Sequence, residues 1–209
     1  MILRGKNVHF SYPGEPIFSS FDFELKEGEK VVVKGESGSG KSTLFRLIMG
    51  FEFPDDGEVL FEGEPLKGDV LRDFRRKSAW LPQDLNLGDG TVLEVVQYPF
   101  RFKQSGNKMP EDHQIKQIFK DLGLEEETLK KTFSDLSTGQ RQRVGLAICI
   151  LLNKPVMLLD EPTSALDEGS KEKAINHLFS DNKRTILSTS HDPYWIERCD
   201  RIIDLDKQT

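Results

Sequence analysis

A glycine-rich segment near the N-terminus has residue types and spacing suited to holding a phosphate. It fits the pattern G-x-x-x-x-G-K-[ST] and consists of Gly35, Glu36, Ser37, Gly38, Ser39, Gly40, Lys41, Ser42 and Thr43. Glycines let the backbone wrap tightly, so successive N–H groups turn toward one anion, and a helix that follows adds its own unpaired N–H groups. Lys41 is then expected to reach the β- and γ-phosphates of a nucleotide, and the Ser42 hydroxyl to bind Mg²⁺. A Gly/Ser-rich turn without a ligand is the alternative, but a strand pattern before the loop and a helical pattern after it favour phosphate binding.

Two acids follow a second apolar run. Val156–Leu159 leads directly into Asp160 and Glu161. Beside a phosphate loop, the first acid supports Mg²⁺, and the second is placed to orient or deprotonate an attacking water. A strand that ends in polar residues at the surface would give the same pattern, although the phosphate loop upstream argues against that interpretation. Pro162 lacks a backbone N–H and fits a chain that turns away from the strand here.

These residues need strands and helices that bring them together. Short apolar runs bounded by turn residues are typical of buried parallel strands, and helical periodicity lies between them. The candidate strands are Val31–Val33, Val156–Leu159, Thr185–Leu187 and Ile202–Leu205, and the clearest helices are Ser42–Met49 and Gln140–Leu152. This alternation predicts an α/β fold with a mainly parallel sheet.

The N-terminal part of the chain predicts a different arrangement. Strand patterns at Asn7–Tyr12, Ile17–Leu25 and Gly57–Glu62 are separated by turn residues, which indicates an antiparallel β subdomain. From about residue 84 to 153 the pattern is mostly helical and predicts an inserted helical subdomain. No repeat or long linker divides the 209 residues, so we expect residues 1–209 to form a single domain.

Composition limits the partners. The formal net charge is −6, whereas nucleic-acid binders usually carry a basic excess, so we expect no nucleic-acid partner. The basic run Arg72, Arg75, Arg76 and Lys77 is interpreted as a solvated face. No apolar stretch approaches the roughly 20 residues of a membrane span, and no N-terminal secretory signal is visible. Cys149 and Cys199 lack CxxC spacing, which is typical of reduced thiols in a cytoplasmic protein.

The segment Leu136–Gln140, Leu-Ser-Thr-Gly-Gln, resembles the LSGGQ signature of the ATP-binding-cassette (ABC) family. Further motifs of that family follow the same order along the chain. Tyr12 matches the aromatic residue that stacks on adenine, Gln83 matches the Q-loop glutamine, and His191 matches the switch histidine. Ser164–Asp167 matches the D-loop. The resemblance covers essentially the whole chain and implies a P-loop NTPase core.

The resemblance implies ATP as the nucleotide, Mg²⁺ as its metal ion, and a homodimer in which two copies meet head to tail around two ATP molecules. In such a pair, Ser137, Gly139 and Gln140 of one copy contact the ATP held by the other copy. The implied catalytic residues are Lys41, Gln83, Glu161 and His191, and the implied Mg²⁺ ligands are Ser42, Gln83 and Asp160. Ser137 and Gln140 also have the spacing of a helix capping box, which is compatible with an anion site at a helix start.

Thr138 departs from the family pattern, which has glycine at this position. A side chain near the incoming nucleotide and a less free backbone predict slower or weaker formation of the ATP-bound pair. Glu161 and His191 are both retained. We therefore expect hydrolysis, and not a nucleotide-gated adaptor without turnover.

Within the family, the resemblance favours a transporter subunit that is peripheral on the inner face of the cell membrane and drives a separate integral membrane subunit. Soluble members that act in DNA repair, chromosome organisation or translation are the alternative. Repair and chromosome members carry long coiled coils between Q-loop and signature, but no sustained heptads lie between Gln83 and Leu136. Translation members generally carry two cassettes, and one is present here.

The segment Thr91–Phe100 resembles small bacterial two-component exporters implicated in iron and metal homeostasis. It therefore predicts export of iron or a related metal, and an importer of an amino acid or other small solute is the alternative. The resemblance places the contact groove for the membrane subunit at about residues 83–105. There, Tyr98, Phe100 and Phe102 either line the groove or belong to the core of the helical region.

Overall fold

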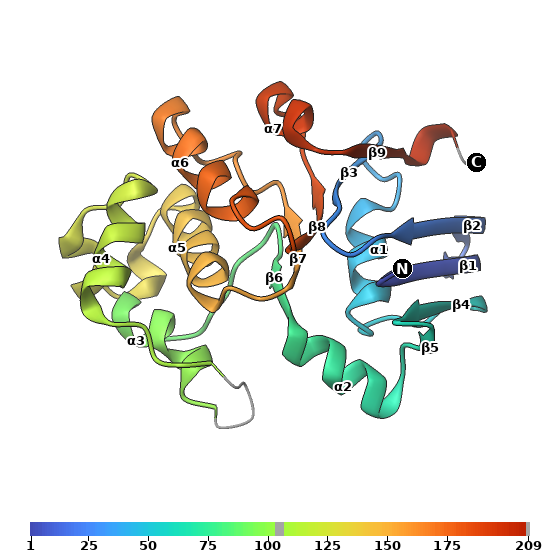
Figure 1. Cartoon of the computed structure of the whole chain (residues 1–209), viewed down its shortest axis with the longest axis horizontal. Helices are drawn as coiled ribbons and strands as arrows, with labels where there is room; N and C mark the ends of the chain where they lie inside the picture. The colour runs from blue at the N-terminus through green and yellow to red at the C-terminus, as the bar shows by residue number, and fades with distance from the viewer. Residues whose placement is uncertain (103–106, 208–209) are drawn as a thin grey trace.

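Two β-sheets form the framework of the chain, which a computed structural model describes over residues 1–102 and 107–207 (Figure 1). The parallel sheet contains, in spatial order, β6 (Ser78–Leu81), β7 (Val156–Asp160), β8 (Thr185–Thr189), β3 (Lys30–Lys34) and β9 (Arg201–Asp204). The antiparallel sheet contains, in spatial order, β2 (Glu15–Leu25), β1 (Leu3–Tyr12), β4 (Asp56–Phe61) and β5 (Glu64–Pro65).

Helices connect and cover these sheets. The α-helices are α1 (Lys41–Ile48), α2 (Gly68–Lys77), α3 (Val92–Gln97), α4 (Asp112–Asp121), α5 (Thr138–Leu152), α6 (Glu168–Phe179) and α7 (Pro193–Arg198). The short 3₁₀ segments are η1 (Tyr98–Phe100), η3 (Glu126–Lys130), η4 (Phe133–Asp135) and η5 (Leu205–Lys207). The predicted fold class is confirmed: an α/β P-loop core with a parallel sheet, an N-terminal antiparallel sheet and additional helices. No helix of the described residues is long and apolar enough to span a bilayer.

The parallel sheet is buried on both faces by two apolar clusters. Along β7, Met157 and Leu159 belong to one cluster, whereas Val156 and Leu158 belong to the other. Successive side chains of a strand point to opposite faces, which explains why its sequence is a continuous apolar run. This run gives each face of the sheet an equally apolar surface for packing.

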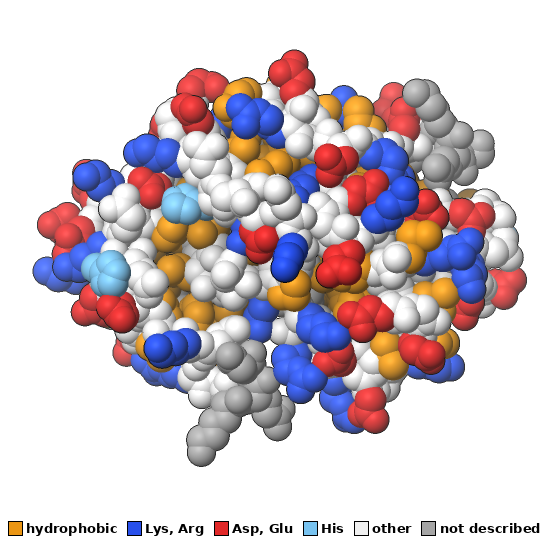
Figure 2. Space-filling model, in the orientation of Figure 1, with side chains coloured by type: hydrophobic (Ala, Val, Ile, Leu, Met, Phe, Trp, Pro, Cys, Tyr) orange, Lys and Arg blue, Asp and Glu red, His pale blue; other side chains and the backbone are white. Residues whose placement is uncertain are grey.

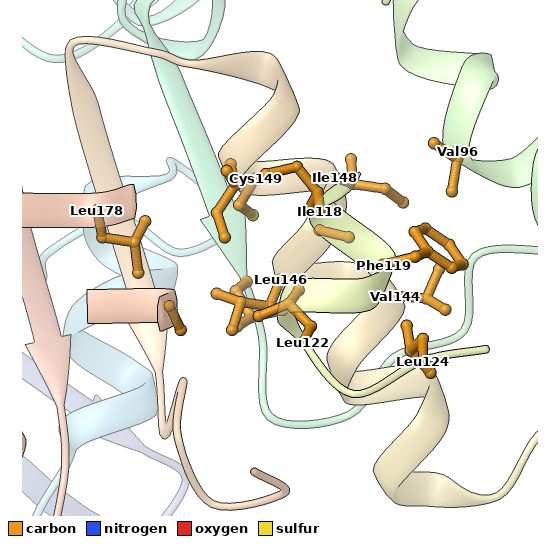
Figure 3. Packing of buried hydrophobic residues seen from close by; sticks show 14 of the residues in the cluster. Val96, Ile118, Phe119, Leu122, Leu124, Val144, Leu146, Ile148, Cys149 and Leu178 are labelled. Atoms are coloured by element: carbon orange, nitrogen blue, oxygen red, sulfur yellow. The ribbon is translucent and has the colours of Figure 1, made fainter. Parts of the chain in front are cut away.

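The helices α3, α4 and α5 gather at one end of the molecule (Figure 1). Phe119 of α4 and Leu122, the C-cap residue that follows it, pack with α5 residues such as Val144 in the cluster that Figure 3 shows. The same cluster also contains the β7 residues on that face of the sheet. Helix α5 therefore shares one core with both α4 and the parallel sheet. A distinct helical subdomain at about residues 84–153 is a proposal.

The elements that were not predicted from the sequence include α2, β5 and β6. Only Leu71 and Phe74 of α2 are buried, and the rest of the helix is mostly polar, so its sequence contains no apolar run. The basic run lies on this helix. The predicted solvated face is confirmed for Arg72 and Arg76, whose side chains are 79% and 59% exposed. Arg75 instead donates to the main-chain oxygen of Met49 at 2.7 Å and links α2 to the end of α1.

Candidate nucleotide-binding site

The carboxyl ends of β3, β7 and β8 meet at one edge of the parallel sheet and border a cavity of about 650 Å³. Open α/β sheets bind ligands at this edge, because the loops that leave the strands converge there. The cavity is lined by Tyr12, Glu15, Ile17, Ser37, Gly38, Gly40, Lys41, Ser42, Thr43, Gln83, Asp160, Glu161, Ser164 and His191. The structure therefore brings together predicted site residues from the loop, the strand ends and the Q-loop.

The start of α1 presents free backbone N–H groups to this cavity. Its N-cap residue is Gly40, which has a φ of 95° and makes no side-chain capping bond. A Cβ atom at Gly40 would lie 2.6 Å from Cγ2 of Ile17 and 2.9 Å from Cζ of Phe18, so only glycine fits. Uncapped N–H groups and the positive end of the helix dipole together form an anion site.

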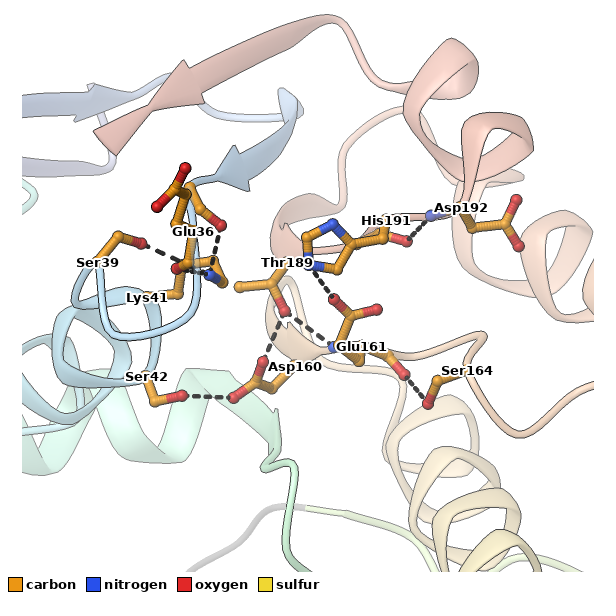
Figure 4. A network of polar contacts seen from close by, with 12 residues as sticks. Glu36, Ser39, Lys41, Ser42, Asp160, Glu161, Ser164, Thr189, His191 and Asp192 are labelled. Carbon is orange, nitrogen blue, oxygen red and sulfur yellow. Dashed lines mark hydrogen bonds and ion pairs between the residues drawn. The ribbon is translucent and has the colours of Figure 1, made fainter. Parts of the chain in front are cut away.

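The ammonium group of Lys41 lies over the loop and is held by main-chain oxygens. Its Nζ donates to the oxygens of Gly35 and Glu36, each at 2.6 Å, and to Oγ of Ser39 at 3.5 Å (Figure 4). These carbonyls keep the cation beside the start of α1. In this position Lys41 can exchange carbonyl contacts for phosphate oxygens.

A buried chain of hydrogen bonds fixes Asp160. Its side chain accepts from Oγ of Ser42 at 3.1 Å and from Oγ1 of Thr189 at 2.6 Å (Figure 4). The same Thr189 oxygen accepts the backbone N–H of Glu161 at 3.0 Å. Asp160 is only 5% exposed, so both of its oxygens need partners of this kind. The network ties the first residues of α1 to the ends of β7 and β8.

Glu161 has a different environment from its neighbour Asp160. Its backbone lies in the left-handed region at φ 50°, an unusual conformation for a residue with a side chain. Burial raises the pKa of its carboxyl group above the ordinary value, Asp160 acts in the same direction, and His191 opposes the shift. The His191 Nε2 lies 3.6 Å from a carboxylate oxygen of Glu161, and the His191 side chain is 75% exposed.

Tyr12 and Gln83 enter the cavity from elements outside this network. The ring of Tyr12 makes an edge contact with Phe10, with 5.0 Å between the ring centroids. Gln83 follows β6 and is exposed, and its main-chain oxygen accepts a hydrogen bond from the side-chain amide of Gln142 in α5. Both residues line the same cavity as Lys41 and Glu161.

The predicted signature residues lie elsewhere. Ser137 caps α5: its Oγ accepts the N–H of Gln140 at 3.2 Å, and Oε1 of Gln140 accepts the N–H of Ser137 at 3.1 Å. Both residues border a separate hollow, and Gly139 is the second residue of α5. Thr138 is exposed at the helix start. The capping box is thus present, and no signature residue lines the cavity that holds Lys41.

Sequence reasoning missed three residues that support the site. Thr189 bridges Asp160 and Glu161, Gln142 holds Gln83, and both carboxylate oxygens of Asp206 accept the N–H of Glu36 at 3.1 Å. The only available signal was the position of Thr189, two residues before His191 at a strand end. The other two act across long sequence separations, which no local pattern reveals.

The fold and the loop at the sheet edge define a P-loop nucleotide-binding domain. The ABC transporter family profile matches residues 18–164, and the chain belongs to that family. It is 34% identical to the ABC transporter ATP-binding protein YxdL of Bacillus subtilis, over 97% of this chain and 82% of that protein. It is 32% identical to the ATP-dependent lipid A-core flippase of Escherichia coli, over 95% of this chain but only 35% of the flippase.

Solved structures agree with this assignment. A dimeric, post-hydrolysis structure of the ATP-binding cassette MJ0796 bound to ADP and Pi has 31% sequence identity and a TM-score of 0.81, and the match covers 97% of this chain and 94% of that one. A bacterial Atm1-family ABC exporter with ATP bound has 25% identity and a TM-score of 0.84, over 99% of this chain and 37% of the exporter. The chain is therefore an ATP-binding and ATP-hydrolysing domain.

Proposed function

We propose that this chain powers a separate membrane subunit and that it turns over ATP as a head-to-tail pair of copies. The observation that carries the proposal is the separation of two predicted nucleotide contacts within one copy. Lys41 and Glu161 border one cavity, whereas Ser137 and Gln140 border another hollow. A signature that does not line its own copy's cavity would need a second copy to complete the site. The dimeric structures of the similar MJ0796 cassette support this pairing.

The residues of the cavity suit ATP with Mg²⁺. The described residues contain no group of three or more His, Cys, Asp or Glu side chains placed to hold a metal ion, so phosphate and water oxygens would complete its ligand set. Ser42 and Asp160 supply hard oxygen atoms only 3.1 Å apart, and Gln83 lines the same cavity. Bound there, Mg²⁺ would neutralise charge on the phosphate oxygens during transfer.

The other residues of the cavity have separate roles in nucleotide binding and hydrolysis. Tyr12 offers a ring face to adenine, and Lys41 and the start of α1 hold the phosphates. Glu161, with its raised pKa, is suited to orient a water and take its proton. His191 adjoins Glu161 at 3.6 Å and is exposed toward the cavity, where it can contact the γ-phosphate.

A mixing experiment tests the composite site. Lys41→Ala removes the loop cation, and Ser137→Phe blocks the signature, so each variant alone should be inactive. A mixed pair has one site with an intact loop from the Ser137→Phe copy and an intact signature from the Lys41→Ala copy. We expect the mixture to regain about a quarter of wild-type turnover, since half of the pairs are mixed and half of their sites are intact. Turnover no higher than that of the separate variants would contradict the proposal.

Two exposed aromatic side chains support a contact with the membrane subunit. Tyr98 and Phe102 are 59% and 52% exposed and make an edge contact at 5.0 Å, whereas Phe100 is buried. Phe100 therefore belongs to the core, and the exposure of Tyr98 and Phe102 supports the proposed contact. The contact groove expected at about residues 83–105 includes positions 103–106, which lie outside the described residues. Acidic and basic side chains are interspersed over the face in Figure 2, which supports the proposal that nucleic acid is not the partner.

This contact can be tested by co-purification from membranes, which also tests the proposed position on the inner face of the cell membrane. Replacing both Tyr98 and Phe102 with Ala should reduce the amount of chain that purifies with a hydrophobic subunit, while ATP hydrolysis by the isolated chain persists. Ile202→Ala is a matched control, because Ile202 is an exposed apolar residue on β9. Equal recovery of both variants would indicate that the contact lies elsewhere on the chain. A chain that purifies with no membrane subunit at all would contradict the transporter role.

We further propose that the cargo is iron or a related metal and that it leaves the cell. The support is the likeness of Thr91–Phe100 to small bacterial two-component exporters. This segment forms α3 and η1 and includes the exposed Tyr98. Deleting the protein should raise cellular iron and lower survival under iron and peroxide stress. Unchanged iron and survival, with reduced uptake of an amino acid or other small solute, would favour an importer.

A further inference from the structure

The segment that carries Gln83 is held by α5. The side-chain amide Nε2 of Gln142 donates to the main-chain oxygen of Gln83, across a separation of 59 residues in sequence. This contact reaches the backbone of the Q-loop and leaves the Gln83 side chain free to face the cavity. Gln142 itself does not line that cavity, so it is not placed to touch the nucleotide.

Gly145 adds a second contact between α5 and the same segment. A Cβ atom at Gly145 would lie 2.8 Å from Cδ1 of Leu81 and closer still to Cδ1 of Leu85. These two leucines flank Gln83 on either side in sequence. Glycine in a helix interior is unfavourable, so its presence here is explained by the close approach of the helix to the segment. The two contacts lie about one helical turn apart on α5.

Stability alone does not explain a glutamine at position 142. Its side-chain oxygen Oε1 is buried and has no hydrogen-bond partner among the described residues. A buried polar atom without a partner is unfavourable, and an apolar residue of similar length would avoid that penalty. The amide group of Gln142 is therefore retained for its bond to Gln83.

We propose that Gln142 is a positioning residue for ATP hydrolysis: it fixes the main chain at Gln83 so that the Gln83 side chain stays directed into the nucleotide cavity. The proposal rests on the role of Gln83 proposed above. With this role, α5 has two functions. Its N-cap residue Ser137 belongs to the signature, and Gln142, near the start of the helix, holds the Q-loop of the same copy.

The test is Gln142→Met, which keeps the length of the side chain and removes its donor. We expect turnover to fall about tenfold and the Mg²⁺ concentration for half-maximal turnover to rise several-fold. ATP affinity without Mg²⁺ should stay within about twofold, and the thermal midpoint should be unchanged or higher. Gln142→Glu, with the same shape but no donor, should behave alike in turnover and serves if the Met variant does not fold. Gln117→Met, at an exposed glutamine in α4, is the matched control and should leave turnover unchanged.

A double variant separates positioning from a general structural effect. If Gln142 acts through Gln83, then Gln142→Met should add no further loss of turnover to Gln83→Ala. Additive losses, or wild-type turnover in Gln142→Met, would overturn the inference while leaving the role of Gln83 intact. No effect of Gln83→Ala itself would instead overturn the proposed role of Gln83 and this inference with it.

Discussion

The starts of α1 and α5 are both predicted to face ATP, yet they differ in what satisfies their first N–H groups. At α1, the N-cap Gly40 makes no side-chain bond, and the helix opens into a cavity lined by Asp160 and Glu161. At α5, Ser137 and Gln140 close a complete capping box outside that cavity. The α1 start therefore has no side-chain cap, whereas the side chains of the α5 start already pair with the N–H groups of Ser137 and Gln140.

This difference leads us to expect that one copy holds ATP without hydrolysing it efficiently. The loop and the strand ends already share one edge of the parallel sheet within a single copy, so we expect ATP binding to need no partner. In the proposed pair, the signature is a capped helix start that would meet an anion only when another copy supplies it. Each prediction below alters one of the two helix starts or a residue that couples to it.

The largest effect is expected at α1. Lys41→Ala removes the cation that lies over the loop, so turnover should fall at least about 100-fold and ATP should bind much more weakly. Turnover and ATP affinity of the isolated chain are the measurements. Lys26→Ala, at an exposed lysine, should behave like the wild type. Normal ATP affinity in Lys41→Ala would mean that the loop does not hold the phosphates.

A similarly large loss of turnover, with a different origin, is expected at α5. Ser137→Phe should lower turnover about 100-fold, while one copy still binds ATP within about twofold of the wild-type affinity. Ser134→Phe, at an exposed serine just before the signature, is the control. A parallel loss of binding and turnover in Ser137→Phe would show that the signature belongs to the same copy's site.

A smaller effect concerns stability near α1. Because burial raises the pKa of Glu161, the folded state favours the protonated carboxyl, and its ionisation at neutral pH opposes folding. Glu161→Gln should therefore unfold at a higher temperature than the wild type at pH 7–8, by roughly 2–4 °C for each kcal/mol. The gain should shrink as the pH falls through the raised pKa and vanish below the ordinary value of 4.5. Melting curves across pH would check this, with exposed Glu27→Gln as the control. A gain that does not change with pH would contradict the assigned cause.

The smallest effect is expected from Thr138→Gly at the start of α5. Removing the exposed side chain should strengthen pairing and raise turnover about two- to threefold, while the glycine lowers helix stability by at most about 1 kcal/mol. Turnover against protein concentration measures pairing. If neither pairing nor turnover changes, the departure from the family pattern is neutral.

The residues of the site can be predicted from the sequence better than the residues and elements that hold them in position. Lys41, Asp160 and His191 stand in local patterns whose spacing follows from phosphate chemistry and strand ends. The buried strands could be predicted because both faces of the parallel sheet are apolar, as in Val156–Leu159. These features all depend on neighbours in sequence.

The unpredicted features depend on contacts between distant segments. Helix α2 is mostly polar and is held by Arg75 on the main chain of Met49, and the short β6 pairs with β7. The bond from Gln142 to Gln83 links two elements through a main-chain oxygen, for which side-chain type carries no signal. Register and packing decide such contacts, and both arise only in the folded chain.

The central claim is that the α1 site of one copy is completed by the α5 start of another. Size-exclusion or sedimentation analysis of Glu161→Gln with saturating ATP and Mg²⁺ tests it most directly, because bound ATP is then not consumed. We predict a dimer that returns to a monomer when Ser137→Phe is added, with ATP still bound. A Glu161→Gln chain that binds ATP and stays monomeric, or a dimer unaffected by Ser137→Phe, would contradict the account.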